Sequence, residues 1–144
     1  MRTIKYIVVH CTATLPSATV EAILRFWKQV RGWKQPGYHY LVKATGEIVQ
    51  LLDEAVPSNG VLGYNSHCVN ISYIGGLTPD KKNGDTRTPA QEESLYRKIL
   101  ELLKKYPGAQ LKGHWEFPKQ GGRTCPNFNV REWFKSYSEK ISGK

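Results

Sequence analysis

The stretch Tyr6-Ile7-Val8-Val9-His10-Cys11-Thr12-Ala13-Thr14 is a β-branched apolar run that ends in a histidine and then in small hydroxyl residues. Such a run predicts a buried central strand. Side chains alternate along a strand, so Val8 and His10 are expected on one face, with Val9 and Cys11 on the other. His10 then stands at the carboxyl end of the strand, either as a zinc ligand or as a half-buried histidine hydrogen-bonded to backbone.

The amino-acid composition limits which kind of protein this chain can be. The chain has 144 residues, of which 40% are hydrophobic and 23% charged, which is typical of one globular domain. We therefore expect a single domain over 1–144, with a core from about 4 to 140. The net charge of +9 favours anionic partners such as nucleic acid, an anionic glycan or a membrane surface. Three cysteines, an odd number, argue against a disulfide framework.

Strand and helix patterns alternate along the chain. Helices are predicted to begin after Thr19, at the capping box Thr88-Pro89-Ala90-Gln91, and after Asn129. Further strands are predicted over 38–42, 47–51, 69–74 and 110–114. The irregular segment from about 53 to 68 is long enough to indicate a functional loop. The predicted fold is α/β, a central mixed β-sheet flanked by α-helices.

Seven side chains offer an imidazole or a thiol to a metal: His10, His39, His67, His114, Cys11, Cys68 and Cys125. His10 and His114 end predicted strands, and Cys125 follows a glycine-rich loop. Two imidazoles and a thiolate leave one tetrahedral position open for water, as in catalytic zinc sites. Spacing alone is a weak signal, because it fits no compact structural zinc pattern.

Seven motifs, taken in their order along the chain, give a more specific signal than the spacing of the possible ligands. They are Val9-His10-Cys11-Thr12-Ala13-Thr14, Gly37-Tyr38-His39-Tyr40-Leu41-Val42-Lys43, Gly63-Tyr64-Asn65, Ile74-Gly75-Gly76, Thr88-Pro89-Ala90-Gln91, Gly113-His114-Trp115-Glu116 and Cys125-Pro126-Asn127-Phe128. In this order and approximate spacing, the chain resembles the zinc N-acetylmuramoyl-L-alanine amidases of the bacteriophage-lysozyme and peptidoglycan-recognition-protein type. The resemblance runs from about 4 to 133.

The resemblance implies hydrolysis of the amide between the lactyl group of N-acetylmuramic acid and L-alanine of the stem peptide. It also implies one Zn²⁺ per chain in a cleft at one edge of the sheet, with His10, His114 and Cys125 as ligands. Tyr38 falls on the family's catalytic tyrosine, where a phenol can hydrogen-bond the attacking water or the tetrahedral intermediate.

The sequence departs from the family pattern at three places. Arg123 stands where phage enzymes usually carry a lysine; an arginine can stabilise an oxyanion but stays charged, so it is a poor proton donor. The region 59–62 lacks a histidine that phage relatives often have. Asn70 stands where a small glycine is common. These departures either tune substrate choice or weaken activity.

Other candidates have plainer interpretations. His39 follows Tyr38 and should point to the opposite face, which favours a core or supporting role over metal binding. Cys11 faces away from His10 and is expected to be buried as a small hydrophobic residue. Glu116 is expected to be a surface carboxylate, although it could orient a ligand or act as a base.

The leading hypothesis is therefore a zinc-dependent peptidoglycan hydrolase, with a non-catalytic peptidoglycan-binding protein of the same fold as the alternative. Tyr64, Asn65 and His67 are expected to contact peptidoglycan or muropeptides. Nucleic acid is disfavoured, because the basic residues are scattered over predicted helices. We expect a monomer without membrane insertion. No signal peptide is visible, so we expect synthesis in the cytosol, with action on the wall after separate release or on cytosolic muropeptides.

Overall fold

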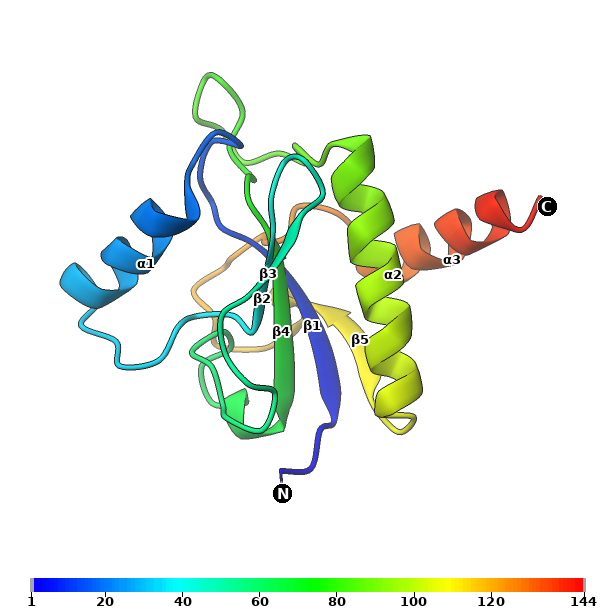
Figure 1. Cartoon of the computed structure of the whole chain (residues 1–144), viewed down its shortest axis with the longest axis horizontal. Helices are drawn as coiled ribbons and strands as arrows, with labels where there is room; N and C mark the ends of the chain where they lie inside the picture. The colour runs from blue at the N-terminus through cyan, green and yellow to red at the C-terminus, as the bar shows by residue number, and fades with distance from the viewer. Residues whose placement is uncertain (1, 144) are drawn as a thin grey trace.

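A five-stranded mixed sheet forms the centre of the computed structural model, which describes residues 2–143 (Figure 1). The strand order is β3-β2-β4-β1-β5. The strands are β1 (Tyr6–Cys11), β2 (Tyr40–Val42), β3 (Ile48–Gln50), β4 (Cys68–Tyr73) and β5 (Gln110–Gly113). The helices are α1 (Val20–Gln29), α2 (Pro89–Lys105) and α3 (Val130–Ile141), with short 3-10 helices η1 (Asn65–His67) and η2 (His114–Glu116). The predicted α/β class is confirmed.

The register of the central strands brings two of the predicted ligands together. β1 is parallel to β4 on one side and to β5 on the other. Val9 pairs with Gly113, so His10 and His114 follow at the same level of two adjacent strands. His114 itself begins η2 instead of ending the strand. The carboxyl ends of parallel strands share one edge of the sheet, which is where ligand sites form in such folds.

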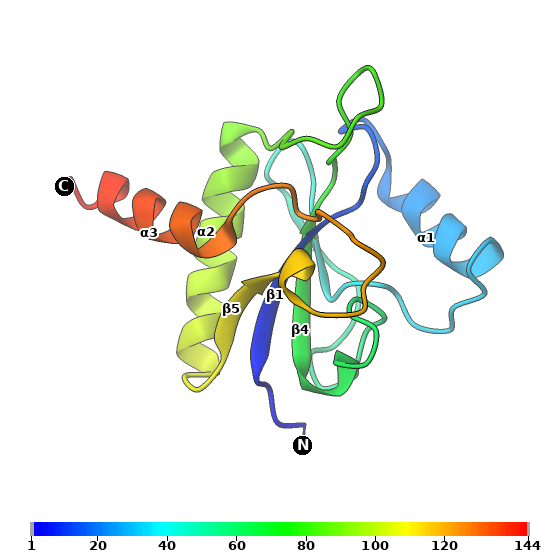
Figure 2. The same cartoon turned by 180° about the vertical axis from the view of Figure 1, so that it is seen from behind.

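The two faces of the sheet are covered differently. α2 and α3 pack against the face that carries Ile7, Val9 and Cys11, and together they enclose the larger apolar cluster. The opposite face, with Val8, packs against loops, and α1 covers its outer part. In Figures 1 and 2, α1 lies on the side of the sheet away from α2 and α3. This arrangement leaves room for a site between α1 and the strand ends.

Local signals explain where the helices begin. Thr19 Oγ1 accepts a hydrogen bond from Ala22 N at the start of α1. Thr88 and Gln91 form the predicted capping box of α2, and Asn129 caps α3. Each cap satisfies backbone N–H groups that have no partner inside the helix. No helix in the described part of the chain is both long and apolar enough to cross a membrane.

Glu54 fixes the long segment between β3 and η1. Its side chain, almost fully buried, accepts hydrogen bonds from the hydroxyls of Tyr40 and Tyr106 and pairs with Lys105 at 3.0 Å. Burial alone would raise the pKa of Glu54, but hydrogen bonds from these partners outweigh burial and lower that pKa. Arg2 donates to the Glu54 carbonyl as well. This segment forms part of the cleft described below, so Glu54 holds a cleft wall in place.

Glu54→Ala is expected to lower the free energy of unfolding at pH 7 by about 2–3 kcal/mol, because buried hydroxyls lose their charged acceptor. The lowered pKa means that the carboxylate stabilises the fold above its ordinary range near about 4.3, and that this contribution fades as pH falls. Urea unfolding at pH 7 and pH 3 measures both effects. Glu47→Ala, which removes an exposed ion pair with Lys43, should cost less than about 0.5 kcal/mol. Equal losses in the two variants would contradict this role.

Candidate metal centre

Three potential ligand atoms converge at the carboxyl ends of β1 and β5. The ligand atoms of His10, His114 and Cys125 all lie within 4.8 Å of one another. The imidazole centroids of the two histidines are 4.8 Å apart. Both histidines are buried, and Cys125 is partly buried. A set of two nitrogens and one sulfur is chemically suited to zinc.

The ring of His10 is oriented by an amide. Its Nε2–H donates to Asn70 Oδ1 at 2.8 Å, inside the core. Its Nδ1 is fully buried and has no hydrogen-bond partner among the described residues. A buried polar nitrogen without a partner is costly, so its persistence calls for a function. Holding one imidazole nitrogen and freeing the other is how proteins prepare a histidine to bind a metal.

His114 is arranged in the same way. Its Nε2–H donates to Gln120 Oε1 at 3.0 Å. Gln120 is itself buried, and its amide nitrogen donates to the carbonyls of Leu62 and Pro118. The glutamine therefore ties the histidine to the cleft wall. It also fixes the tautomer that leaves Nδ1 of His114 free.

Asn70 and Gln120 hydrogen-bond the two histidines, and neither contact is predicted from the sequence. From the sequence, Asn70 is only a departure from the family pattern. In the structure its Nδ2 donates to Ser58 at 2.8 Å, and a Cβ added at Gly60 would lie 2.5 Å from its Cγ. The glycine at 60 thus makes room for the larger side chain at 70. The signal that could have found Asn70 is its pairing with Val8, two residues before His10 on the adjacent strand, and this pairing is known only from the register.

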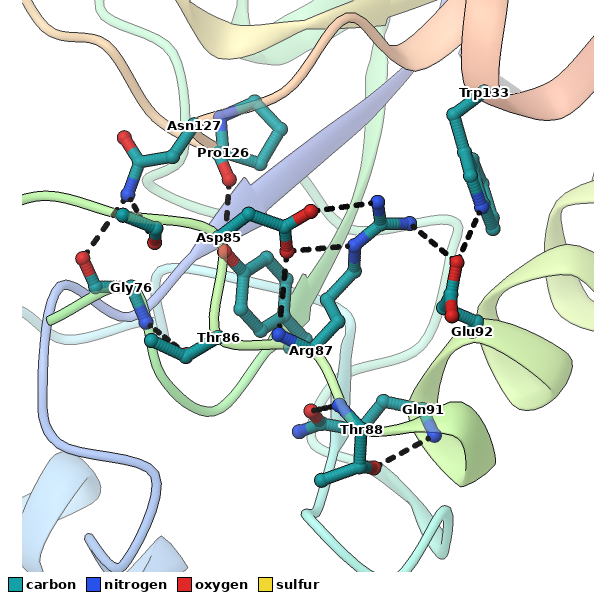
Figure 3. A network of polar contacts seen from close by, with 12 residues as sticks. Gly76, Asp85, Thr86, Arg87, Thr88, Gln91, Glu92, Pro126, Asn127 and Trp133 are labelled. Carbon is teal, nitrogen blue, oxygen red and sulfur yellow. Dashed lines mark hydrogen bonds and ion pairs between the residues drawn. The ribbon is translucent and has the colours of Figure 1, made fainter. Parts of the chain in front are cut away.

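Cys125 is held by the residues that follow it. Tyr73 donates its hydroxyl to the Pro126 carbonyl at 2.8 Å, and Asn127 Nδ2 donates to the carbonyls of Gly76 and Gly84 (Figure 3). Sγ of Cys125 accepts from the backbone N of Cys11 at 3.0 Å. The loop is therefore anchored to the end of β1, beside His10.

A second set of contacts shown in Figure 3 fixes the surrounding framework. The guanidinium of Arg87 pairs with Asp85 at 2.9 Å (Figure 3). The same guanidinium lies over the ring of Phe128, 3.4 Å from its centroid. Trp133 donates its indole N–H to Glu92 at 3.0 Å. These contacts join the loop before α2 to the segment leading into α3. That segment begins directly after Cys125, so these contacts also restrict the position of the thiol.

Burial sets the protonation states. It lowers the pKa of His10 well below its ordinary value, and the neighbouring His114 lowers it further. Burial also lowers the pKa of His114. Both imidazoles are therefore neutral near pH 7, as a metal ligand must be. Burial raises the pKa of the Cys125 thiol well above its ordinary value, and a hydrogen bond with Cys11 adds to this shift. A bound cation would lower the pKa of the Cys125 thiol and so favour the thiolate.

A cleft of about 600 Å³ opens from these ligands toward α1. Tyr38 lines it, with its ring 4.8 Å from that of His10 and its hydroxyl donating to the Cys11 carbonyl at 3.1 Å. Burial raises the pKa of Tyr38, so the phenol keeps its proton. Arg123 is exposed and lines the cleft beside the ligands. The predicted catalytic pair and the predicted metal ligands therefore border one cleft.

The structure separates the three predicted substrate contacts. Asn65 lines the cleft, and its Oδ1 accepts from Val61 N at 2.7 Å. Tyr64 packs on the rings of Tyr6 and Phe117 and does not line the cleft. His67 ends η1 directly before β4, at the opposite end from the strand ends that carry the ligands, and donates to the Thr3 carbonyl. Tyr64 and His67 are close to Asn65 in sequence, but they do not lie at the cleft, because the chain changes direction at η1.

The remaining candidates have structural partners. His39 is fully buried, donates to the Val56 carbonyl at 2.8 Å and accepts from Asn70 N. Cys11 lies in the apolar cluster under α2, as alternation predicted. The expectation that Glu116 is a surface carboxylate is wrong. Its side chain is 10% exposed, accepts from Gly113 N and pairs with Arg131, because η2 folds it back over β5.

Comparison with known proteins agrees with this architecture. A sequence model of the N-acetylmuramoyl-L-alanine amidase family matches residues 1–128. The endolysin of Escherichia phage T7 is 35% identical over 130 residues, covering 90% of this chain and 84% of the endolysin.

Solved structures extend the comparison. The endolysin N-acetylmuramoyl-L-alanine amidase LysCS of Clostridium intestinale is 27% identical, with a TM-score of 0.79 over 99% of this chain and 86% of that one. The bumblebee protein PGRP-SA, at 17% identity and a TM-score of 0.73, shares the fold over 95% of this chain and 83% of its own. The match of the family model to most of the chain, together with the level of identity to a phage endolysin, shows that this protein belongs to the N-acetylmuramoyl-L-alanine amidase family.

Proposed function

We propose that this protein is a zinc-dependent peptidoglycan hydrolase that cleaves the amide between the lactyl group of N-acetylmuramic acid and L-alanine of the stem peptide. The observation that carries the zinc dependence is the convergence of His10, His114 and Cys125, in which Nδ1 of His10 is buried without a partner. Family membership supports the amidase activity. The substrate is peptidoglycan, and we propose that the enzyme acts as a monomer.

The residues present fit a zinc ion. His10 and His114 would bind through Nδ1, since Nε2 of each donates to a side-chain amide, and Cys125 would bind through Sγ. Such a three-ligand set is typical of catalytic zinc. When bound, zinc supplies Lewis-acid chemistry and lowers the pKa of a coordinated water toward about 7.

Tyr38 and Arg123 have different roles in the proposed reaction. The phenol of Tyr38 keeps its proton and can donate a hydrogen bond to the carbonyl oxygen as negative charge develops there. Arg123 places a permanent positive charge in the same cleft. Because an arginine holds its proton, Arg123 stabilises charge without supplying the proton that the leaving amine needs. The attacking water supplies the proton that the leaving amine gains, while Tyr38 keeps its own proton and donates only a hydrogen bond.

Mass spectrometry of digested muropeptides tests this function. We expect two products, one with a free lactyl carboxyl and one with a free L-alanine amine. A chelator should abolish the reaction and added zinc should restore it. Cleavage of a glycosidic bond or of a bond within the stem would contradict the proposed reaction. Binding of muropeptides without any product would favour the non-catalytic alternative.

Asn70→Ala is expected to weaken zinc binding about 10–100-fold, because the ring of His10 loses the acceptor that orients it. Asn70→Asp keeps an oxygen at that position and should retain zinc affinity. Competition with a metal-sensitive dye measures the dissociation constant, and thermal unfolding checks that each variant is folded. Ser58→Ala, which removes only the outer partner of Asn70, is the matched control. Unchanged zinc affinity in a folded Asn70→Ala protein would show that the amide does not position the ligand.

A further inference from the structure

The cleft extends beyond the metal ligands to a positive group just past the end of α1. Its wall there includes Ala22, Phe26, Trp27 and Arg31. A series of ring contacts joins this wall to the ligands: His10 to Tyr38 at 4.8 Å, and Tyr38 to Trp27 at 5.3 Å. The cleft is therefore one continuous surface from the metal centre to the end of α1.

Arg31 is held by aromatic rings. Its Cζ lies 5.8 Å from the ring centre of Phe26 and 5.7 Å from that of Trp33. Trp33 in turn stacks on Trp27 at 6.2 Å. Gly37 permits this packing, because a Cβ there would lie 3.0 Å from the Trp27 ring. Cation–π contacts of this kind restrict where a guanidinium can point while leaving its N–H groups available.

Those N–H groups have no acidic partner within the described chain. Among residues 2–143 the guanidinium of Arg31 forms no ion pair and no side-chain hydrogen bond. No aspartate or glutamate lines the cleft, whereas Arg31 and Arg123 both do. An oriented guanidinium in a cleft without carboxylates is complementary to an anionic group of the bound molecule.

We infer that Arg31 binds a free carboxylate of the stem peptide, which determines substrate specificity at a subsite beside the end of α1. This inference rests on the proposed function. The choice of ligand follows from charge, because the peptide branch of the substrate carries free carboxylates, whereas N-acetylated sugars carry none. The peptide then extends from the scissile amide along α1, and the apolar rings of Phe26 and Trp33 flank the bound carboxylate.

Calorimetry with the stem peptide released by the reaction tests this subsite, since that peptide is not hydrolysed further at the lactyl amide. The wild-type protein should bind the peptide with free carboxyls on the order of tenfold more tightly than the same peptide with every side-chain and C-terminal carboxyl amidated. Arg31→Gln should bind both peptides equally weakly. Peptides amidated at one carboxyl at a time identify which carboxylate is bound.

Arg25→Gln is the matched control, because Arg25 lies on α1 close in sequence to Arg31, is exposed and does not line the cleft. It should retain the wild-type preference. Persistence of the preference in Arg31→Gln, or an equal loss in Arg25→Gln, would overturn the inference. Absence of any preference in the wild type would do the same. Muropeptide cleavage is scored separately, so a failure of this subsite is distinguishable from a failure of the amidase activity.

Discussion

Cys125→Ala is expected to lower kcat/KM for muropeptide cleavage at least about 1000-fold, equivalent to about 4 kcal/mol of transition-state stabilisation. The thiolate is the only anionic member of the ligand set, so its removal leaves two neutral imidazoles. Two such ligands bind zinc too weakly to keep it at ordinary metal concentrations. Measurement of initial rates at several substrate concentrations gives the loss.

Cys68→Ala provides the control for this experiment. Cys68 is also a buried thiol, but it lies in a separate apolar cluster at the start of β4. Its removal is expected to leave kcat/KM within about twofold of wild type, with a modest loss of stability from the small cavity. Near-normal cleavage by a folded Cys125→Ala protein would show that the thiol is not needed for the reaction.

The second large effect is expected for Tyr38→Phe, which should lower kcat about 100-fold or more while KM changes little. The ring remains to pack against His10 and Trp27, so only the hydroxyl is lost. Loss of a hydrogen bond that strengthens only as charge develops on the carbonyl oxygen lowers kcat and leaves ground-state binding unaffected. Steady-state kinetics on a soluble muropeptide separates the two constants.

Tyr64→Phe removes a hydroxyl from a tyrosine that packs outside the cleft, and its kcat should match that of the wild type. If Tyr38→Phe raised KM with kcat unchanged, the phenol would act in substrate binding instead of in the chemical step. If neither constant changed, Tyr38 would have only a packing role.

The fold was largely predictable because its signals are local. The capping residues Thr19, Thr88 and Asn129 each mark a helix start that the structure confirms. The apolar run of β1 correctly predicted a central strand. Boundaries were less accurate: β2 begins at Tyr40, two residues later than predicted, since strand ends depend on pairing with a neighbour.

The site was predictable only in part. Alternation correctly placed His10 and Cys11 on opposite faces, and the family resemblance selected the three ligands that the structure brings together. The contacts of Asn70 and Gln120 with the histidines could not be predicted from the sequence, because they depend on which segments meet in space. Tyr64 precedes η1 and His67 ends it, and neither residue lines the cleft, although both are close in sequence to Asn65, which does.

The most direct test of the account is the zinc content of the wild-type protein and of Cys125→Ala, both purified without added metal and analysed by elemental mass spectrometry. The account predicts about one zinc per chain in the wild type and a small fraction of that in the variant. Equal zinc in both proteins, or no zinc in the wild type even after reconstitution, would contradict a metal centre formed by His10, His114 and Cys125.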